Sequence, residues 1–253
     1  MSLMFNWQQI KNRHHGLTFD DVLLMPKKSE LRSRRDPSLK SKLTKTKFLE
    51  TPIISANMDT VTEAKMAIAM NNLGGLGIIH RFMNVEQQVA HIREVAESGA
   101  PIISASIGVN ADFKERTAAL VAAGVNVMTI DIAHGHSVQM METLKWLKDT
   151  YAGLEVTAGN MASPDAAIDL IEAGADAIKV GIGPGSMCTT RIITGCGVPQ
   201  LTAIALCAEV AQSYGVPVIA DGGIRTSGDM VKAFAAGANT IMLGSMLSGT
   251  IET

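Results

Sequence analysis

The sequence predicts an α/β fold in which eight parallel strands and the helices between them close into a (β/α)8 barrel. From residue 52 onward, apolar runs of strand length recur, and each is followed by a longer segment with helical periodicity. The chain has 253 residues, a usual size for such a barrel when it forms one domain. Hydrophobic residues make up 47% and aromatic residues only 4%, so we expect a large aliphatic core.

The regular part of the chain divides into strands and helices in strict alternation. The strands expected cover residues 52–56, 77–80, 102–107, 127–131, 155–158, 177–181, 216–220 and 240–243. The helices expected cover residues 62–73, 85–97, 111–123, 137–150, 164–173, 199–214 and 227–236. Ser163 and Pro164 are typical of a helix start, and Gly124, Gly174 and Gly237 of helix ends. Strands that are apolar on both faces and alternate with helices indicate a parallel sheet. The first strand–helix unit lacks G-x-G-x-x-G, which argues against a Rossmann fold.

Residues 1–50 are charged and irregular, and we expect them to pack as an N-terminal segment on a barrel formed by residues 51–253. Leu17, Phe19, Val22 and Leu23 are suited to plug or cap one end of that barrel. A short β-hairpin is expected within residues 29–48. No eighth helix follows the last strand, so we expect the working protein to have further residues.

Net charge, cysteine count and the length of the apolar runs limit the kinds of partner and cell compartment that we expect for this protein. The formal net charge is −2 and the sequence pI is about 6.3, which gives no footprint for nucleic acid or an anionic membrane surface. Cys188, Cys196 and Cys207 are an odd and sparse set, which argues against a disulfide framework and for a reducing compartment. Every apolar run is short and interrupted, so we expect no signal peptide or spanning segment. The sequence therefore predicts a cytoplasmic enzyme.

Polar and glycine residues follow the predicted strands, at the end of a barrel where active sites lie. Gly222-Gly223 and Gly244-Ser245 follow the seventh and eighth strands, the usual place for a phosphate in this architecture. Asp221 would then face the sugar and accept from ribose hydroxyls, and Asp131 is a candidate for a second ribose. His134 and His136 have no companions with metal-ligand spacing, so they do not predict a metal site.

The glycine-rich loop at residues 181–191 follows the sixth strand. Gly181, Gly183 and Gly185 permit close approaches that a side chain would forbid. The amides of such a loop can cradle an anion, and its carbonyls can face a cation. Cys188 then lies where a nucleophile would meet the bound group. The alternative is a glycine-rich turn that carries a small buried thiol.

Several segments together resemble one known family over nearly the whole chain. They are Leu-Thr-Phe-Asp-Asp-Val-Leu-Leu at 17–24, Asn-Met-Asp-Thr-Val at 57–61, Gly-Ile-Gly-Pro-Gly-Ser-Met-Cys-Thr-Thr-Arg at 181–191, Asp-Gly-Gly at 221–223 and Gly-Ser-Met-Leu-Ser-Gly at 244–249. In this order and spacing they resemble the IMP dehydrogenase/GMP reductase family. The segment at 181–191 is similar to the family's catalytic cysteine loop.

The resemblance implies a role for each matching residue. Cys188 would attack C2 of a purine mononucleotide, Thr190 would help to position the hydrolytic water, and hydride would pass to a nicotinamide stacked on the base. Other implied positions are Ser186, Gly223, Gly244 and Ser245 for the phosphate, Asp221 for the ribose, Met58 for the base, and Asp131 and Asn160 for the nicotinamide nucleotide. The backbone carbonyls of Gly183, Gly185 and Cys188 match the family's potassium site.

Two reactions occur in the family, and the motifs favour one of them. Segments 133–137, 224–228 and 243–246 look like those of bacterial dehydrogenases, which oxidise IMP to XMP with NAD. Asn57 and segment 27–33 look more like reductases, which convert GMP to IMP with NADPH. The short connection at 97–101 leaves no room for the paired CBS domains that most dehydrogenases insert. The active-site loops touch ligand, so we expect an IMP dehydrogenase without CBS domains.

Three further expectations concern what the resemblance leaves open. The family is usually tetrameric, so we expect a homotetramer. Its mobile flap, whose Arg-Tyr pair activates water in dehydrogenases, would lie beyond residue 253. Apart from GMP reductase, the alternatives are an FMN-dependent barrel oxidoreductase, whose phosphate would suit Gly223 and Ser245, and a non-catalytic nucleotide-binding barrel.

Overall fold

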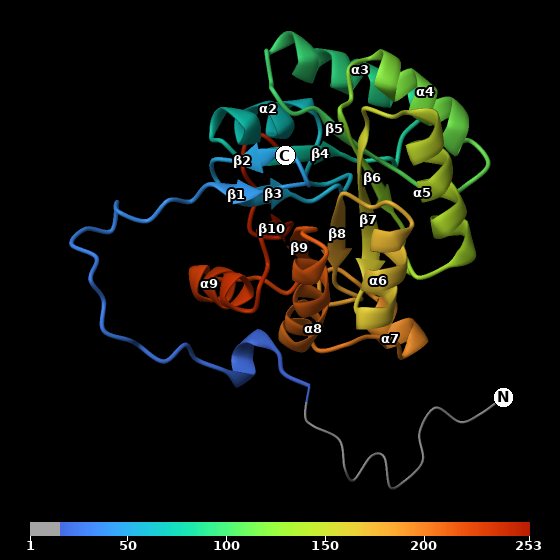
Figure 1. The fold of residues 1–253 in the computed structure, drawn as a ribbon. Helices are drawn as coiled ribbons and strands as arrows, with labels where there is room; N and C mark the ends of the chain where they lie inside the picture. Colours follow the sequence, from blue (N-terminus) through green and yellow to red (C-terminus); the bar gives the residue numbers. More distant parts are fainter. Residues whose placement is uncertain (1–15) are drawn as a thin grey trace, which may run out of the picture.

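The computed structural model describes residues 16–253 and contains a closed barrel of parallel strands (Figure 1). The order around the barrel is β10-β3-β4-β5-β6-β7-β8-β9, so the first and last barrel strands pair. The strands are β3 (Ile53–Ser55), β4 (Leu76–Ile79), β5 (Ser104–Ile107), β6 (Val127–Asp131), β7 (Glu155–Met161), β8 (Ala177–Val180), β9 (Val218–Asp221) and β10 (Thr240–Leu243). The predicted (β/α)8 TIM barrel is confirmed.

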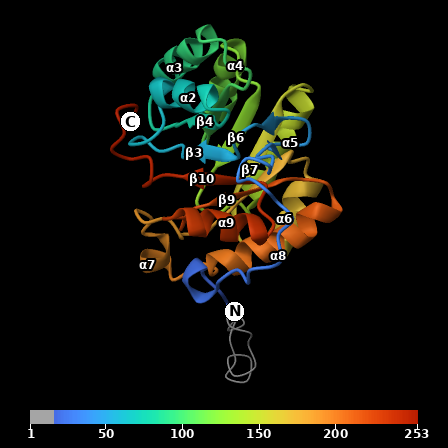
Figure 2. The same ribbon diagram turned by 90° about the vertical axis from the view of Figure 1, so that its left-hand side faces the viewer.

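Helices cover the outside of the barrel (Figures 1 and 2). They are α2 (Ala64–Asn72), α3 (Val85–Glu97), α4 (Phe113–Ala122), α5 (Val138–Thr150), α6 (Pro164–Glu172), α8 (Gln200–Ser213) and α9 (Ser227–Ala235), with a short α7 (Thr190–Thr194). The Ser163 side chain accepts from the Ala166 amide at the start of α6, and Gly174 has a φ of 107° just past its end. None of the helices in residues 16–253 is long and apolar enough to span a membrane.

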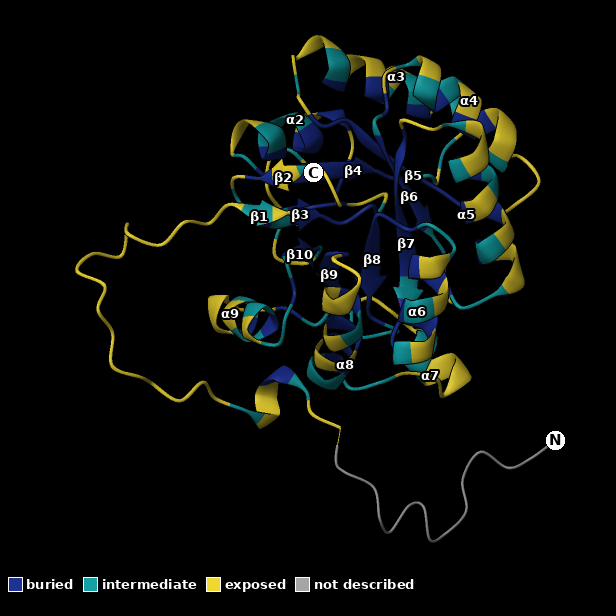
Figure 3. Cartoon of the chain, viewed as in Figure 1, coloured by how far each residue is buried: buried dark blue, intermediate teal, exposed yellow. Residues whose placement is uncertain are grey.

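The barrel strands are buried, as their dark blue colour in Figure 3 shows, and the buried apolar side chains form two separate groups. Alternate strand residues such as Ile54, Ile78 and Met242 fill the barrel interior, and their neighbours Ile79 and Ile241 pack between strands and helices. Successive strand residues point to opposite faces, so both faces of each strand are buried. The same alternation places the last interior residues of β6, β8 and β9 inside the C-terminal end of the barrel.

A two-stranded antiparallel hairpin closes the N-terminal end of the barrel. It consists of β1 (Ser41–Lys42) and β2 (Phe48–Leu49), so it is shorter and later than the hairpin expected within residues 29–48. Leu43 and Leu49 are buried in the interior group of side chains. The Thr44 hydroxyl donates to Glu155, the first residue of β7, over 2.7 Å. The hairpin therefore plugs this end with both apolar and hydrogen-bonded contacts.

The N-terminal segment also reaches the opposite end of the barrel. The single-turn helix η1 (Phe19–Asp21) lies beside α9, while residues 22–40 swing away from the barrel as an extended loop (Figure 1). Phe19 is buried, and its carbonyl accepts from Lys232 over 2.7 Å. Leu17 and Leu23 are exposed, so of the apolar residues expected to cap the barrel, Phe19 makes the buried contact.

Candidate active site

Three loops meet at the C-terminal end of the barrel around one pocket. The pocket has a volume of about 200 Å³, and its lining includes Ser186, Gly223 and Ser245, from the loops after β8, β9 and β10. Thr18, Phe19 and Asp20 of the N-terminal segment form another part of its wall. Three of the residues expected to hold a phosphate therefore share one cavity.

The loops pack backbone against backbone, and glycine is what makes this possible. A Cβ on Gly181 would lie 2.0 Å from the Asp221 carbonyl oxygen. Gly222 has a φ of 93°, and a Cβ there would lie 2.9 Å from Pro184 and 3.0 Å from the Gly185 nitrogen. A side chain at either position would separate the loops after β8 and β9.

Cys188 lies exposed on the loop after β8. Its Sγ lies 3.2 Å from the hydroxyl of Thr190, the first residue of α7, and its amide donates to the Gly185 carbonyl. Arg191 stabilises the loop, because its guanidinium donates to the carbonyls of Ile182 and Val198. The Cys188 thiol is thus exposed to solvent on a loop that hydrogen bonds hold in place.

The other two cysteines differ from Cys188 in their surroundings. Cys196 is exposed and lies just past α7, whereas Cys207 is buried in α8. Burial raises the pKa of the Cys207 thiol to about 12, which keeps it protonated and unreactive at neutral pH. Cys207 is therefore a core residue.

Met58 lies beside the loop that follows β10. Its Sδ is 3.6 Å from the point that a Cβ on Gly244 would occupy, and its side chain packs against the interior group of barrel residues. Thioethers adapt to flat apolar surfaces, so Met58 is suited to contact a base. A Cβ on Gly244 would make only an ordinary van der Waals contact with Met58, so the two residues are close neighbours.

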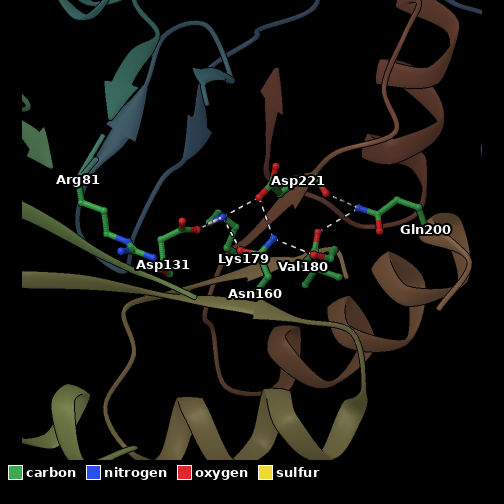
Figure 4. A network of polar contacts seen from close by, with 8 residues as sticks. Arg81, Asp131, Asn160, Lys179, Val180, Gln200 and Asp221 are labelled. Atoms are coloured by element: carbon green, nitrogen blue, oxygen red, sulfur yellow. Dashed lines mark hydrogen bonds and ion pairs between the residues drawn. The ribbon is translucent and has the colours of Figure 1, made fainter. Parts of the chain in front are cut away.

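A buried lysine joins the predicted ligand-binding carboxylates into one network (Figure 4). The Lys179 ammonium donates to Asp131 Oδ1 and to Asp221 Oδ2 over 2.6 Å each, and also to Asn160 Oδ1. The Lys179 side chain is 2% exposed, whereas those of Asp131 and Asp221 are 21% and 20% exposed. The ammonium group is therefore buried, while both carboxylates remain partly exposed at the C-terminal end of the barrel.

The charges of this network fix its protonation state. Burial alone would raise the pKa of Asp131, but the charge and hydrogen bond of Lys179, together with Asn57 and Arg81, hold the pKa below its usual value. Burial would likewise lower the pKa of Lys179, yet Asp131 and Asp221 raise it above its usual value. Lys179 therefore remains an ammonium at neutral pH, and it cannot serve as a general base.

Comparison with known proteins agrees with this geometry. The family model described as "IMP dehydrogenase / GMP reductase domain" matches residues 16–253. The chain belongs to the IMP dehydrogenase/GMP reductase family. An inosine-5'-monophosphate dehydrogenase of Cryptosporidium parvum is 45% identical over 96% of this chain and 70% of its own length. One from Halalkalibacterium halodurans is 38% identical over 98% and 76%. A GMP reductase of Leishmania major is 33% identical over 94% and 75%. The protein is thus an oxidoreductase of this family.

Asp131 and Asn160, the two residues predicted to contact the dinucleotide, differ in how many of their side-chain hydrogen-bonding groups are already used within the protein. Both amide hydrogens of Asn160 are used, because Nδ2 donates to the Gly181 carbonyl and to Asp221 Oδ2 over 2.8 Å each. Asn160 Oδ1 accepts from Lys179. Asp131, by contrast, uses Oδ1 on Lys179 and stays partly exposed. The Asp131 carboxylate therefore stays partly open to a ligand, whereas the Asn160 side chain bonds to the neighbouring loops.

The carbonyl groups expected to bind potassium offer oxygen ligands, the kind that this ion prefers. Potassium is bound by backbone carbonyls that replace its hydration shell. Within residues 16–253, no hydrogen bond reaches the carbonyls of Gly183 or Cys188, and the Gly185 carbonyl accepts only from the Cys188 amide. The described residues contain no group of three His, Cys, Asp or Glu side chains arranged for a metal. Backbone carbonyl oxygens are thus the ligands that this loop could offer to a cation.

Two residues of the site had no predicted role. Lys179 is the one charged residue of β8, and a lysine inside an apolar strand was the available signal. Gln200 opens α8 and donates from Nε2 to the carbonyls of Val180 and Asp221 over 3.0 Å each, which ties β8 to β9. No sequence pattern distinguishes Gln200 from an ordinary residue in the first turn of a helix.

Proposed function

We propose that the protein oxidises IMP to XMP with NAD through a covalent intermediate on Cys188. The observation that carries this proposal is the exposed Cys188 thiol, 3.2 Å from the Thr190 hydroxyl, on the loop that also lends Ser186 to the pocket. Relatives named inosine-5'-monophosphate dehydrogenase at 45% and 38% identity support the choice of reaction.

The bound nucleotide would be held at three points. Its phosphate would lie in the pocket, where Ser186 and Ser245 offer hydroxyl donors and Gly222, Gly223 and Gly244 leave room for close approach. Asp221 Oδ2 already accepts from Lys179, which leaves the other oxygen to accept from ribose hydroxyls. Met58 would contact the base. These contacts would bring purine C2 to the Cys188 sulfur.

The reaction would then pass through two steps on C2. The Cys188 thiolate adds to C2, and the C2–H bond breaks with its electron pair leaving as hydride. NAD, held on the Asp131 side, supplies the hydride acceptor when bound. Water next adds to C2, the C–S bond breaks, and Cys188 leaves as a thiolate. One IMP, one NAD⁺ and one water give one XMP, one NADH and one proton. Thr190, beside the sulfur, is positioned to orient the water.

The remaining features of the proposal follow the family. Potassium would bind the carbonyls of Gly183, Gly185 and Cys188 and would stabilise the loop in its reactive form. The functional assembly would be a homotetramer acting in the cytoplasm. Activity without potassium should therefore fall, and removal of the ion should be reversible.

A paired assay tests the proposed reaction. IMP with NAD and GMP with NADPH are supplied separately, each with and without potassium, and the nicotinamide redox change, XMP and ammonia are measured. We expect turnover of IMP, with loss of turnover in Cys188→Ala and near-normal turnover in the matched control Cys196→Ala. Turnover of IMP by Cys188→Ala would contradict the covalent step.

The same assay separates the other candidates. GMP reductase is the second candidate, because a GMP reductase at 33% identity also matches most of the chain, and ammonia release from GMP would establish it. A bound yellow flavin would favour an FMN enzyme. Thermal stabilisation by nucleotide with no turnover would favour a non-catalytic barrel.

A further inference from the structure

Lys179 is buried in the barrel, where an ammonium group without hydrogen-bond acceptors would be strongly unfavourable. Its side chain is 2% exposed, and its neighbours along β8 are buried apolar residues. An ammonium has three hydrogens, and all three are donated, to Asp131 on β6, Asn160 on β7 and Asp221, the last residue of β9. One cation thus joins the ends of four consecutive barrel strands.

The charge balance around Lys179 depends on that cation. Asp131 and Asp221 each approach its Nζ to 2.6 Å, so the two carboxylates lie close enough to repel one another. The nearby Arg81 donates from Nε to the Asp131 backbone carbonyl over 3.2 Å, and its charge also favours ionised Asp131. Arg81 has no such contact with Asp221. Without Lys179, no cation would lie between the two carboxylates, and their mutual repulsion would favour protonation of one of them.

We propose that Lys179 is a positioning residue that serves both ligand subsites at once. It holds Asp221 oriented toward the mononucleotide and Asp131 oriented toward the dinucleotide. This inference rests on the proposed function, which assigns one ligand to each carboxylate. Its distinctive consequence is that loss of one buried charge impairs both ligands, and does so in a pH-dependent way.

The test measures binding of XMP and of NAD, each alone, by titration calorimetry between about pH 6 and about pH 9. XMP is the product of the proposed reaction, so neither ligand alone turns over. In Lys179→Met we expect each affinity to fall roughly tenfold or more at neutral pH and to recover as pH rises, because ionised carboxylates return. Wild-type affinities should vary little over this range.

Two further variants separate positioning from general damage. Lys179→Arg keeps the charge, and we expect it to regain affinity for both ligands with a flat pH profile. Lys148→Met is the matched control, because Lys148 donates to the buried Asp176 over 2.7 Å at the opposite end of β8. Lys148→Met should lose stability but bind both ligands as the wild-type protein does.

The possible results each decide the question. Wild-type affinities with flat profiles in Lys179→Met would overturn the inference, and so would a loss confined to one ligand. If Lys179→Met does not fold, the double variant with Asp131→Asn replaces it, because that variant removes one charge of each sign. The inference then expects both affinities to fall, because Asp221 has lost the cation that orients it and Asp131 has lost its charge, and a wild-type affinity for XMP would overturn it. A wild-type protein that neither binds XMP nor oxidises IMP would overturn the proposed function as well.

Discussion

The two ends of the barrel differ in packing and in exposure to solvent. At the N-terminal end, Leu43 and Leu49 fill the interior and Thr44 hydrogen-bonds the buried Glu155. At the C-terminal end, glycine loops leave a pocket, Cys188 is exposed, and Lys179 holds two carboxylates that remain partly open. The first end is closed to solvent and complete, whereas the second retains bonding capacity for ligands. Stability and function are therefore separable by mutation.

The largest expected effect is on stability at the closed end. Leu43→Ala removes a fully buried side chain from the plug and should lower the free energy of unfolding by about 2–5 kcal/mol. The kcat of the folded protein should stay close to the wild-type value, because Leu43 contacts no part of the open end. Urea unfolding and steady-state kinetics at low temperature would measure the two quantities. A large fall in kcat with unchanged stability would contradict the separation of the two ends.

The reciprocal effect is expected from Gly181→Ala at the open end. Its Cβ would meet the Asp221 carbonyl at 2.0 Å, so the loops after β8 and β9 must move apart. Displacement of catalytic groups by about 1 Å costs roughly 100-fold in rate, which we expect in kcat/KM. Gly99→Ala is the matched control: Gly99 also has positive φ, but nothing lies within 4 Å of its Cβ position. Equal activity in the two variants would show that the contact is unimportant.

A smaller effect is expected from the polar part of the plug. Thr44→Val removes the hydroxyl that donates to Glu155 Oε2 and should destabilise the protein by about 1–3 kcal/mol, because a buried carboxylate oxygen loses its donor. Glu155 Oε1 keeps its two bonds to Thr46, so the loss is partial. Thermal and urea unfolding would measure it. No change in either would mean that water replaces the hydroxyl.

The smallest expected effect is the acid response of the open end. The pKa of Asp131 is lowered on folding, so its contribution to stability is complete above the unfolded-state value of about 4 and is lost as pH falls through the folded-state value. Urea unfolding between about pH 7 and about pH 3 should therefore show a smaller acid loss in Asp131→Asn than in the wild-type protein. An identical acid loss in both proteins would contradict this account of the network.

The sequence predicts the barrel well because its signals are local. The barrel strands are short, largely apolar runs, and stops such as Gly174 mark the helix ends, so the repeated alternation of strand and helix finds every barrel strand. The helix α7 has five residues, too few to show a period, and the hairpin strands have two each. Such elements are fixed by tertiary contacts, and their ends cannot be found from periodicity.

The candidate site is less accessible from sequence because its bonds are long-range. The segment at 181–191 and the glycines after β9 and β10 point to a phosphate and a nucleophile, and their meeting at one pocket follows from barrel geometry. The partners of Lys179 lie 48, 19 and 42 residues away, which no local pattern reports. Phe19 reaches the pocket from the other end of the chain. Such contacts become visible only once the strands are assembled.

The pairing of β3 with β10 has a consequence for how the protein is made. Ile53 is in register with Ile241, so the ring of strands cannot close until nearly the whole described chain is available. Gly244 and Ser245 immediately follow that last strand, and Thr18–Asp20 at the other extreme supply part of the same pocket wall. Contacts between such distant residues form late and slow folding. During synthesis, therefore, this pocket should form in the same late event that closes the barrel, so a nascent chain should not contain the pocket without a closed barrel.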